Sequence, residues 1–118
     1  MTTPEVKTVL QYVRELLEDE SKWTKGASAK NGSLFSTDPK GKFAERWCLA
    51  GAIIKHSDYE LAFAVSSLLL ECLQKTMPGI KSIVSYNDYN STSHKDILAL
   101  LDAAILACDA EETSNDKA

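Results

Sequence analysis

The stretch that decides the fold is FAERWCLAGAIIKH, residues 43–56. Only the pair Glu45-Arg46 interrupts its apolar residues before Lys55. A helix that is apolar nearly all round is covered by other elements on several sides. We therefore expect a helix over residues 43–56 at the centre of the molecule, where Gly51 and Ala52 let a neighbouring backbone approach closely.

Amphipathic helices are predicted on both sides of this segment. Residues 4–19 repeat apolar side chains at helical spacing, which indicates a first helix with one buried stripe. Further along, Ser57 and Glu60 form a capping box, in which the hydroxyl and the carboxylate each pair with a free backbone N–H. The pair Pro78-Gly79 ends the helix that this box begins.

A fourth helix is predicted near the end of the chain. Ser93 and Asp96 repeat the capping pattern with a shorter acid, and apolar residues then continue at helical spacing to about Asp109. Residues 80–86, IKSIVSY, are rich in β-branched side chains and are expected to form a short extended segment.

The longest irregular stretch lies between the first two helices. Residues 21–42 have no helical periodicity and contain several glycines and a proline. Within them, Asn31-Gly32 is typical of a two-residue hairpin turn, with short strands at about 24–29 and 33–35. The predicted fold class is mostly α, a four-helix single domain with an irregular insert between helices one and two, which holds this short β-hairpin.

Length and composition agree with one domain. The chain has 118 residues, of which 44% are hydrophobic and 25% charged, as in an ordinary soluble globular protein. We expect the globular domain to cover residues 1–110. Residues 111–118 offer no apolar side chain larger than alanine, so a disordered acidic tail is predicted there.

The charge distribution bears on the class of partner. The formal net charge is −4, and residues 109–118 hold four carboxylates against Lys117. The rest of the chain then has 13 acidic and 12 basic residues, a net charge of −1. A nearly neutral body lacks the basic surface that a phosphate backbone requires, so we expect no nucleic-acid partner.

The same sequence predicts a cytoplasmic protein that does not enter a membrane. No apolar run reaches the roughly 18 residues of a membrane span, and the N-terminus lacks the pattern of a signal peptide. Cys48, Cys72 and Cys108 are odd in number and form no CxxC pair, which favours reduced thiols over disulfides or a zinc site.

Cys48 is the residue that allows a catalytic interpretation. A cysteine near a helix N-terminus can have a lowered pKa, because the partial positive charge there favours the thiolate. His94 and either Asn87 or Asp88 would complete the base and the orienting group of a thiol hydrolase. The competing interpretation, which we favour, is that Cys48 is a small core residue and His94 a surface histidine in the first helical turn that bonds to a neighbouring loop.

The polar cluster ahead of the fourth helix allows a binding interpretation. Asn87, Asp88 and Asn90 supply only one carboxylate and match no calcium-loop spacing, so no metal and no cofactor are expected. These side chains are predicted first to cap the following helix and second to form a site. Trp23 and Trp47 are either core residues or the walls of a pocket.

Several sequence blocks together carry a resemblance. They read W-T-K-G-A from Trp23, W-C-L-A-G-A from Trp47, and Asn87-Asp88 followed by T-S-H-K-D-I-L-A-L-L-D from Thr92. This set resembles a family of small bacterial and bacteriophage proteins known only as a domain of unknown function. The likeness covers roughly residues 7–107, and Ile97 stands where that family more often has valine.

The resemblance implies a single intracellular domain of bacterial or phage origin, in the host cytoplasm if phage-encoded. It implies no activity. Its signature positions fall on the following residues of this chain: Trp23, Gly26, Trp47, Cys48, Gly51, Asn87, Asp88 and His94. These residues are compatible with a functional site that the family shares. They are equally compatible with a shared pattern of core packing and helix capping.

Two hypotheses follow for the function. The first, which we favour, is a non-enzymatic binding or accessory protein, in which residues 21–42 and 87–93 form the recognition face and Trp23, Trp47, Asn87 and Asp88 contribute to binding. Its partner would be a protein or a small-molecule ligand, and homo-oligomerisation is left open. The alternative is a thiol-dependent hydrolase or transferase, with Cys48 as nucleophile, His94 as base and Asp88 as the orienting group.

Overall fold

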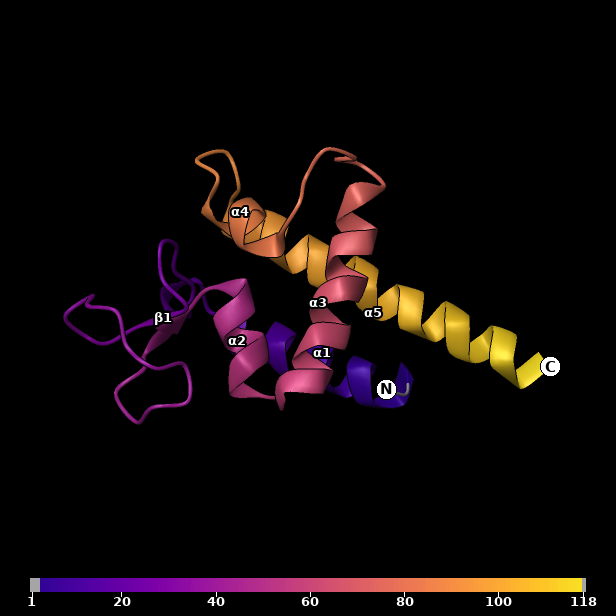
Figure 1. Ribbon diagram of the computed structural model, residues 1–118, viewed down its shortest axis with the longest axis horizontal. Coiled ribbons are helices and arrows are strands. Elements are labelled where there is room, and N and C mark those ends of the chain that lie inside the picture. Colours follow the sequence, from indigo (N-terminus) through magenta and orange to yellow (C-terminus); the bar gives the residue numbers. More distant parts are fainter. Residues whose placement is uncertain (1–2, 118) are drawn as a thin grey trace.

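The first and last helices form the longest contact of the molecule. The computed structural model describes the backbone of residues 3–117 and the side chains of residues 4–110. Helix α1 (Thr3–Leu17) packs along α5 (His94–Lys117), where Lys7 pairs with Asp109 and Arg14 with Asp102. In Figure 1, α5 is the long helix that leads to the C-terminus. The predicted apolar stripe of α1 faces the core, and its buried members are Val6, Val9, Leu10, Val13 and Leu17. The first predicted helix is therefore confirmed.

Helix α3 (Tyr59–Gln74) crosses α5 and closes the core from the other side. Its cap differs from the expected one. Asp58 accepts the N–H of Leu61 at 2.9 Å, whereas the Ser57 hydroxyl donates to the carbonyl of Ile53 at 2.5 Å. Because that hydroxyl is already used by the preceding helix, the predicted Ser57 capping box is wrong, and the helix starts one residue later.

The central segment is half strand and half helix. Residues 46–47 form strand β2 (Arg46–Trp47), and α2 (Leu49–Lys55) begins only after Cys48. The expected start of this helix near residue 43 is therefore wrong, because the backbone before Cys48 pairs with another strand. Its central position is confirmed, since the buried residues of α2 contact α1, α3 and α4.

The predicted close approach at Gly51 is also present. A side-chain carbon added to Gly51 would lie 1.8 Å from the carbonyl oxygen of Ser28. Cys48 N donates to that same oxygen at 3.1 Å, so the backbone of residue 28 lies directly against the start of α2. Only glycine leaves room for this contact.

The insert is ordered by pairing with a strand that lies farther along the chain than expected. Strand β1 (Ala29–Lys30) pairs antiparallel with β2, with Ala29 opposite Trp47. The Asn31 side chain accepts the N–H groups of Ser33 and Phe35 and so closes a turn longer than the predicted two-residue hairpin. Residues 33–35 are therefore part of the turn and not a strand.

A fifth helix replaces the expected extended segment. Helix α4 (Ile83–Asp88) begins at Ser82, whose hydroxyl accepts the N–H of Ser85 at 3.0 Å. Ile83 and Asn87, four residues apart, share the buried face of this short helix. A helix places Ile83 and Asn87 on the same buried face, and this tertiary packing overrides the preference of residues 80–86 for extended structure.

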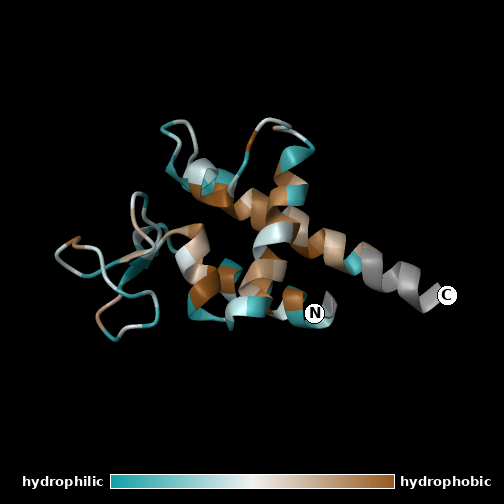
Figure 2. Cartoon of the chain, viewed as in Figure 1, coloured by the Kyte–Doolittle hydropathy of each residue, from teal (hydrophilic) through white to brown (hydrophobic). Residues whose placement is uncertain are grey.

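Overall, the protein is mostly helical, with one small antiparallel strand pair in a single domain, as the sequence predicts. Figure 2 shows hydrophobic residues concentrated where α1, α2, α3 and α5 meet, and only isolated hydrophobic stretches on the loops at the left. The bounds of α5 extend to Lys117, past the end that was expected near Asp109. The side chains of residues 111–118 lie outside the described residues, so their contribution to the fold stays a prediction.

The predicted capping of α5 supports a stability test. Ser93 N donates to the Asp96 carboxylate at 2.9 Å, and Asp96 N donates to the Ser93 hydroxyl at 3.2 Å. We expect Ser93→Ala to lower the free energy of unfolding by about 1 kcal/mol, as loss of such a cap usually does. Ser91→Ala, at an exposed position two residues earlier, is the control and should change it little. Equal effects of the two variants in urea denaturation would contradict the capping role.

Candidate functional site

Asn87 lies at the centre of a buried polar network that joins three parts of the chain. Its side chain is fully buried. The amide oxygen accepts Trp23 Nε1–H at 2.7 Å and the backbone N–H of Leu49 at 3.0 Å. The amide nitrogen donates to the carbonyl of Thr24 and to the Asp88 carboxylate, both at 3.0 Å. The amide oxygen thus accepts two hydrogen bonds and the amide nitrogen donates two, so the side chain has no position left for a ligand.

Asp88 extends this network to the beginning of the insert. The same Asp88 oxygen accepts the N–H of Gly26, also at 3.0 Å, and Gly26 has a φ of +85°, a backbone conformation that favours glycine. The Lys25 ammonium donates to the carbonyl of Tyr89 and lies 5.4 Å from the centre of the Trp23 ring. Residues 24–26 are thereby fastened to the end of α4.

These contacts correct one expectation about residues 87–93. Asn87 and Asp88 belong to α4 and bond to the insert, whereas Ser93 and Asp96 cap α5. Asn87 and Asp88 are thus not caps of the helix that follows them. The reason is tertiary, because the amide finds its partners on segments more than thirty residues away in the sequence.

Trp47 is a core residue that anchors the insert. It is 6% exposed, and its Nε1–H donates to the carbonyl of Pro39 at 3.0 Å. Its own carbonyl accepts the N–H of Thr24 at 3.0 Å. Trp23 is half-buried and gives its N–H to Asn87. Both indole N–H groups are therefore committed within the protein, and any binding role for the two rings is limited to their exposed edges.

Cys48 has the surroundings of a structural thiol. It is 3% exposed and precedes α2, where its sulfur accepts the N–H of Gly51 at 3.3 Å. Burial raises the pKa of the Cys48 thiol and outweighs the lowering effect of the backbone N–H groups of Gly51 and Ala50, while the Asp88 carboxylate adds a smaller raising effect. The lowered pKa that a helix N-terminus favours is therefore outweighed by desolvation.

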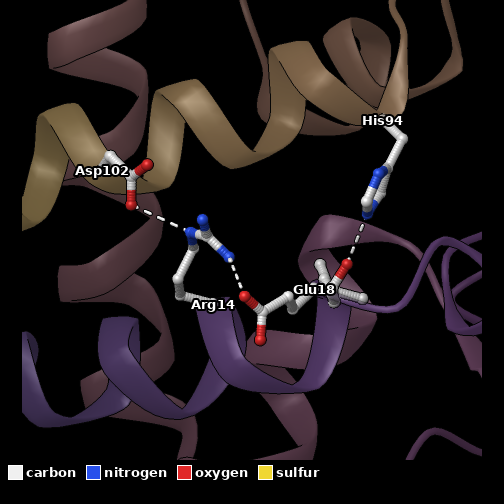
Figure 3. A network of polar contacts seen from close by, with 5 residues as sticks. Arg14, Glu18, His94 and Asp102 are labelled. Atoms are coloured by element: carbon white, nitrogen blue, oxygen red, sulfur yellow. Dashed lines mark hydrogen bonds and ion pairs between the residues drawn. The ribbon is translucent and has the colours of Figure 1, made fainter.

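His94 bonds to the end of the first helix. Its Nε2 lies 2.5 Å from the carbonyl oxygen of Leu17, the contact drawn at the right of Figure 3. The ring is half-buried and lies 5.9 Å from the Trp23 ring, at an interplanar angle of 44°. Each of the three side chains of the thiol hypothesis thus has a different hydrogen-bonding neighbour: Gly51 for Cys48, Leu17 for His94 and Gly26 for Asp88.

A salt bridge next to this contact links the same two helices. Arg14 Nε donates to the Asp102 carboxylate at 2.9 Å, and a guanidinium nitrogen lies 3.9 Å from Glu18 (Figure 3). All three groups are partly open to solvent, so the arrangement contributes orientation more than stability. It belongs to the packing of α1 on α5 and offers no enclosed site.

The tip of the insert presents a feature that the sequence alone did not single out. Leu34, Phe35 and Phe43 are 56%, 70% and 64% exposed. Leu34 also has a φ of +67°, which is strained for a branched side chain. We call residues 30–45 the insert surface. In the sequence, this surface could have been identified from the large apolar residues that lie within an otherwise irregular, polar segment.

The insert surface also borders an open hollow, and the longer segment that contains it carries a net positive charge. A pocket of about 450 Å³ is lined by Asn31, Gly32, Ser33, Lys42, Phe43 and Glu45. Residues 21–46 contain six Lys or Arg against two acidic residues, a net charge of +4. The rest of the chain therefore carries −8, of which −3 lies in residues 109–118. The predicted near-neutral body thus combines a segment of net charge +4 with a remainder of net charge −5.

Neither a metal-binding cluster nor a membrane-spanning helix is found among the described residues. No group of three or more His, Cys, Asp or Glu side chains with the geometry to hold a metal ion occurs among them. Within the same part of the chain, none of the helices is both long and apolar enough to cross a bilayer.

The Asn87 network supports a second stability test. Asn87→Ala leaves the Trp23 and Leu49 N–H groups and the Thr24 carbonyl without their partner, and each buried unpaired group costs about 1–3 kcal/mol. We expect the free energy of unfolding to fall by about 3 kcal/mol or more. Asn90→Ala, at an exposed position nearby, is the control. A loss below about 1 kcal/mol for Asn87→Ala in urea denaturation would show that water replaces the amide.

The state of Cys48 supports a reactivity test. Because the thiolate is the nucleophile and burial disfavours it, iodoacetamide should leave Cys48 of the native protein largely unmodified at neutral pH. In urea, all three cysteines should be alkylated, as measured by peptide mass spectrometry. His94→Ala should not change the native rate at Cys48. Fast modification of Cys48 alone, slowed by His94→Ala, would instead support the thiol-enzyme hypothesis.

Comparison with known proteins identifies a family and adds no activity. No curated protein and no solved structure matches this chain. One family model does match, described as "Family of unknown function (DUF6197)", and it aligns with residues 1–107. That range contains Trp23, Asn87 and His94, and with them the whole Asn87 network. The chain therefore belongs to the family of unknown function DUF6197.

Proposed function

We propose that this chain is a non-enzymatic protein-binding module of the cytoplasm, of bacterial or phage origin, and that the insert surface is its recognition site. The observation that carries the proposal is the exposure of Leu34, Phe35 and Phe43 on one short segment. Clustered exposed apolar side chains with a polar rim are typical of protein interaction sites.

The backbone of the insert supports this proposal. A leucine at φ +67° costs conformational energy, and such strain persists only where the surrounding structure holds it. Here the Asn31 amide closes the turn, β1 pairs with β2, and Trp47 bonds to Pro39. A segment held in this way loses little conformational entropy on binding, which favours affinity.

The Asn87 network is the support of this surface and not its contact residue. It fastens residues 24–26 to α4 and the start of α2, directly before β1. In this proposal Trp23, Trp47, Asn87 and Asp88 contribute to binding by positioning the insert. The thiol-enzyme alternative is disfavoured by the burial of Cys48 and its raised pKa.

The proposal is tested by removing the apolar tip without disturbing the core. Phe35→Ser/Phe43→Ser should change the free energy of unfolding by no more than about 0.5 kcal/mol per site, because both rings are exposed. The same change should abolish specific cross-linked adducts of the protein in cells of its native host, identified by mass spectrometry and reconstituted from purified components.

Leu106→Ser is the matched control, since Leu106 is 69% exposed on α5 and far from the insert in sequence. It should leave the adducts intact. Identical adducts for the wild type and the Phe35→Ser/Phe43→Ser variant would contradict the proposed recognition site.

A further inference from the structure

The outer face of α3 is unusual in its charge and its aromatic content. Residues 57–74 contain Asp58, Glu60 and Glu71 and no Lys or Arg. All three carboxylates are exposed, and Tyr59 and Phe63 on the same helix are 88% and 69% exposed. Helical spacing brings one set of residues to a single side of the helix, which we call the α3 face: Tyr59, Glu60, Phe63, Ser67, Leu70 and Glu71.

An apolar groove runs along this face. A pocket of about 290 Å³ lies between α3, the start of α2 and α4. Phe63 and Leu70 line one wall, and Ile83 and Val84 line the other, with Lys81 at the rim. Val84 is 48% exposed. The groove is therefore open to a large apolar side chain from outside.

The α3 face and the insert surface are complementary. Residues 57–74, which include the α3 face, have a net charge of −3 and border an open apolar groove, whereas the insert surface has three lysines against two carboxylates, a net charge of +1, and presents Leu34, Phe35 and Phe43. Contact between two insert surfaces, or between two α3 faces, would bring net charges of the same sign together. Pairing one surface with the other brings opposite net charges together and gives the exposed apolar side chains a groove to enter.

We propose that a second copy of this chain is the partner of the insert surface, which docks on the α3 face of that copy. This inference rests on the proposed function and names its partner. In one molecule the two surfaces adjoin, because Lys40 Nζ donates to the carbonyl of Ser57 at 3.1 Å, next to the start of α3. A two-fold axis near this boundary places each insert surface against the α3 face of the other copy. The contact is then made twice, and the dimer is closed.

The apolar tip supplies the anchor of this contact. Phe35 or Phe43 of one copy enters the groove beside Phe63 of the other, while Lys42 lies near the carboxylates at Glu60 and Glu71. Aromatic side chains buried at the centre of an interface usually carry most of its affinity, and charges at the rim set orientation and partner choice.

The experiment is analytical ultracentrifugation of the full chain over a range of concentrations, at low and at high salt. We expect a monomer–dimer equilibrium that high salt weakens. Phe43→Ser and Phe63→Ser should each weaken dimerisation by about tenfold or more. Leu106→Ser, outside both surfaces, should leave the dissociation constant unchanged. Far-UV circular dichroism and thermal unfolding of each variant establish that it folds.

Charge exchange makes the test specific for the pairing. Lys42→Glu and Glu60→Lys should each weaken the homodimer, by about tenfold, because each creates two like-charge contacts. When the two variants are mixed, the heterodimer has opposite charges in both contacts, so the mixture should recover dimerisation. A chain that is monomeric at every concentration, or a dimer insensitive to all four substitutions, would overturn this inference.

The outcome separates this inference from the proposed function. A monomeric chain whose adducts with another protein depend on Phe35 and Phe43 would overturn self-docking and leave the recognition role of the insert surface intact. If substitution of Phe35 and Phe43 weakens neither the dimer nor the adducts, both the self-docking inference and the proposed recognition role are overturned.

Discussion

The amide of Asn87 is the interaction on which the rest of the structure depends. It is fully buried, and it satisfies two N–H groups and a carbonyl that would otherwise be unpaired in the interior. Because an unpaired buried polar group costs more than a hydrogen bond gains, the arrangement is specific as well as stable. The start of the insert, the start of α2 and the helix α4 have one relative position in which all of these groups are paired.

This constraint explains why an irregular segment in a small helical domain has a defined shape. Asp88 continues the network to Gly26, β1 then pairs with β2, and Gly51 lets the backbone of Ser28 lie against α2. The result is a loop whose base is held by hydrogen bonds and whose tip exposes Leu34, Phe35 and Phe43. A segment with its polar groups paired at the base and its apolar groups exposed at the tip is suited to contact with another protein.

Hydrogen bonds to the backbone also argue against a catalytic interpretation of Cys48, His94 and Asp88. Cys48, His94 and Asp88 are present in an order that a thiol hydrolase could use, yet each is occupied by a backbone group of its own surroundings. For Cys48 the decisive effect is desolvation, which raises the pKa of the thiol where the helix N-terminus would lower it. In this chain, Trp23, Trp47 and Asn87 are each engaged in hydrogen bonds within the protein.

The sequence by itself determined the helical class, the buried stripe of α1, the central place of residues 49–55, the Ser93–Asp96 cap and the close approach at Gly51. These features depend on local periodicity and on residues a few positions apart, which a linear pattern records. Only the tertiary structure decided that residues 46–47 pair with residues 29–30, that residues 83–88 are helical, and that Asn87 bonds to the insert and not to α5. Each of those outcomes depends on residues that are distant in the chain. The sequence around a single polar side chain such as Asn87 does not indicate which distant groups it will contact when buried.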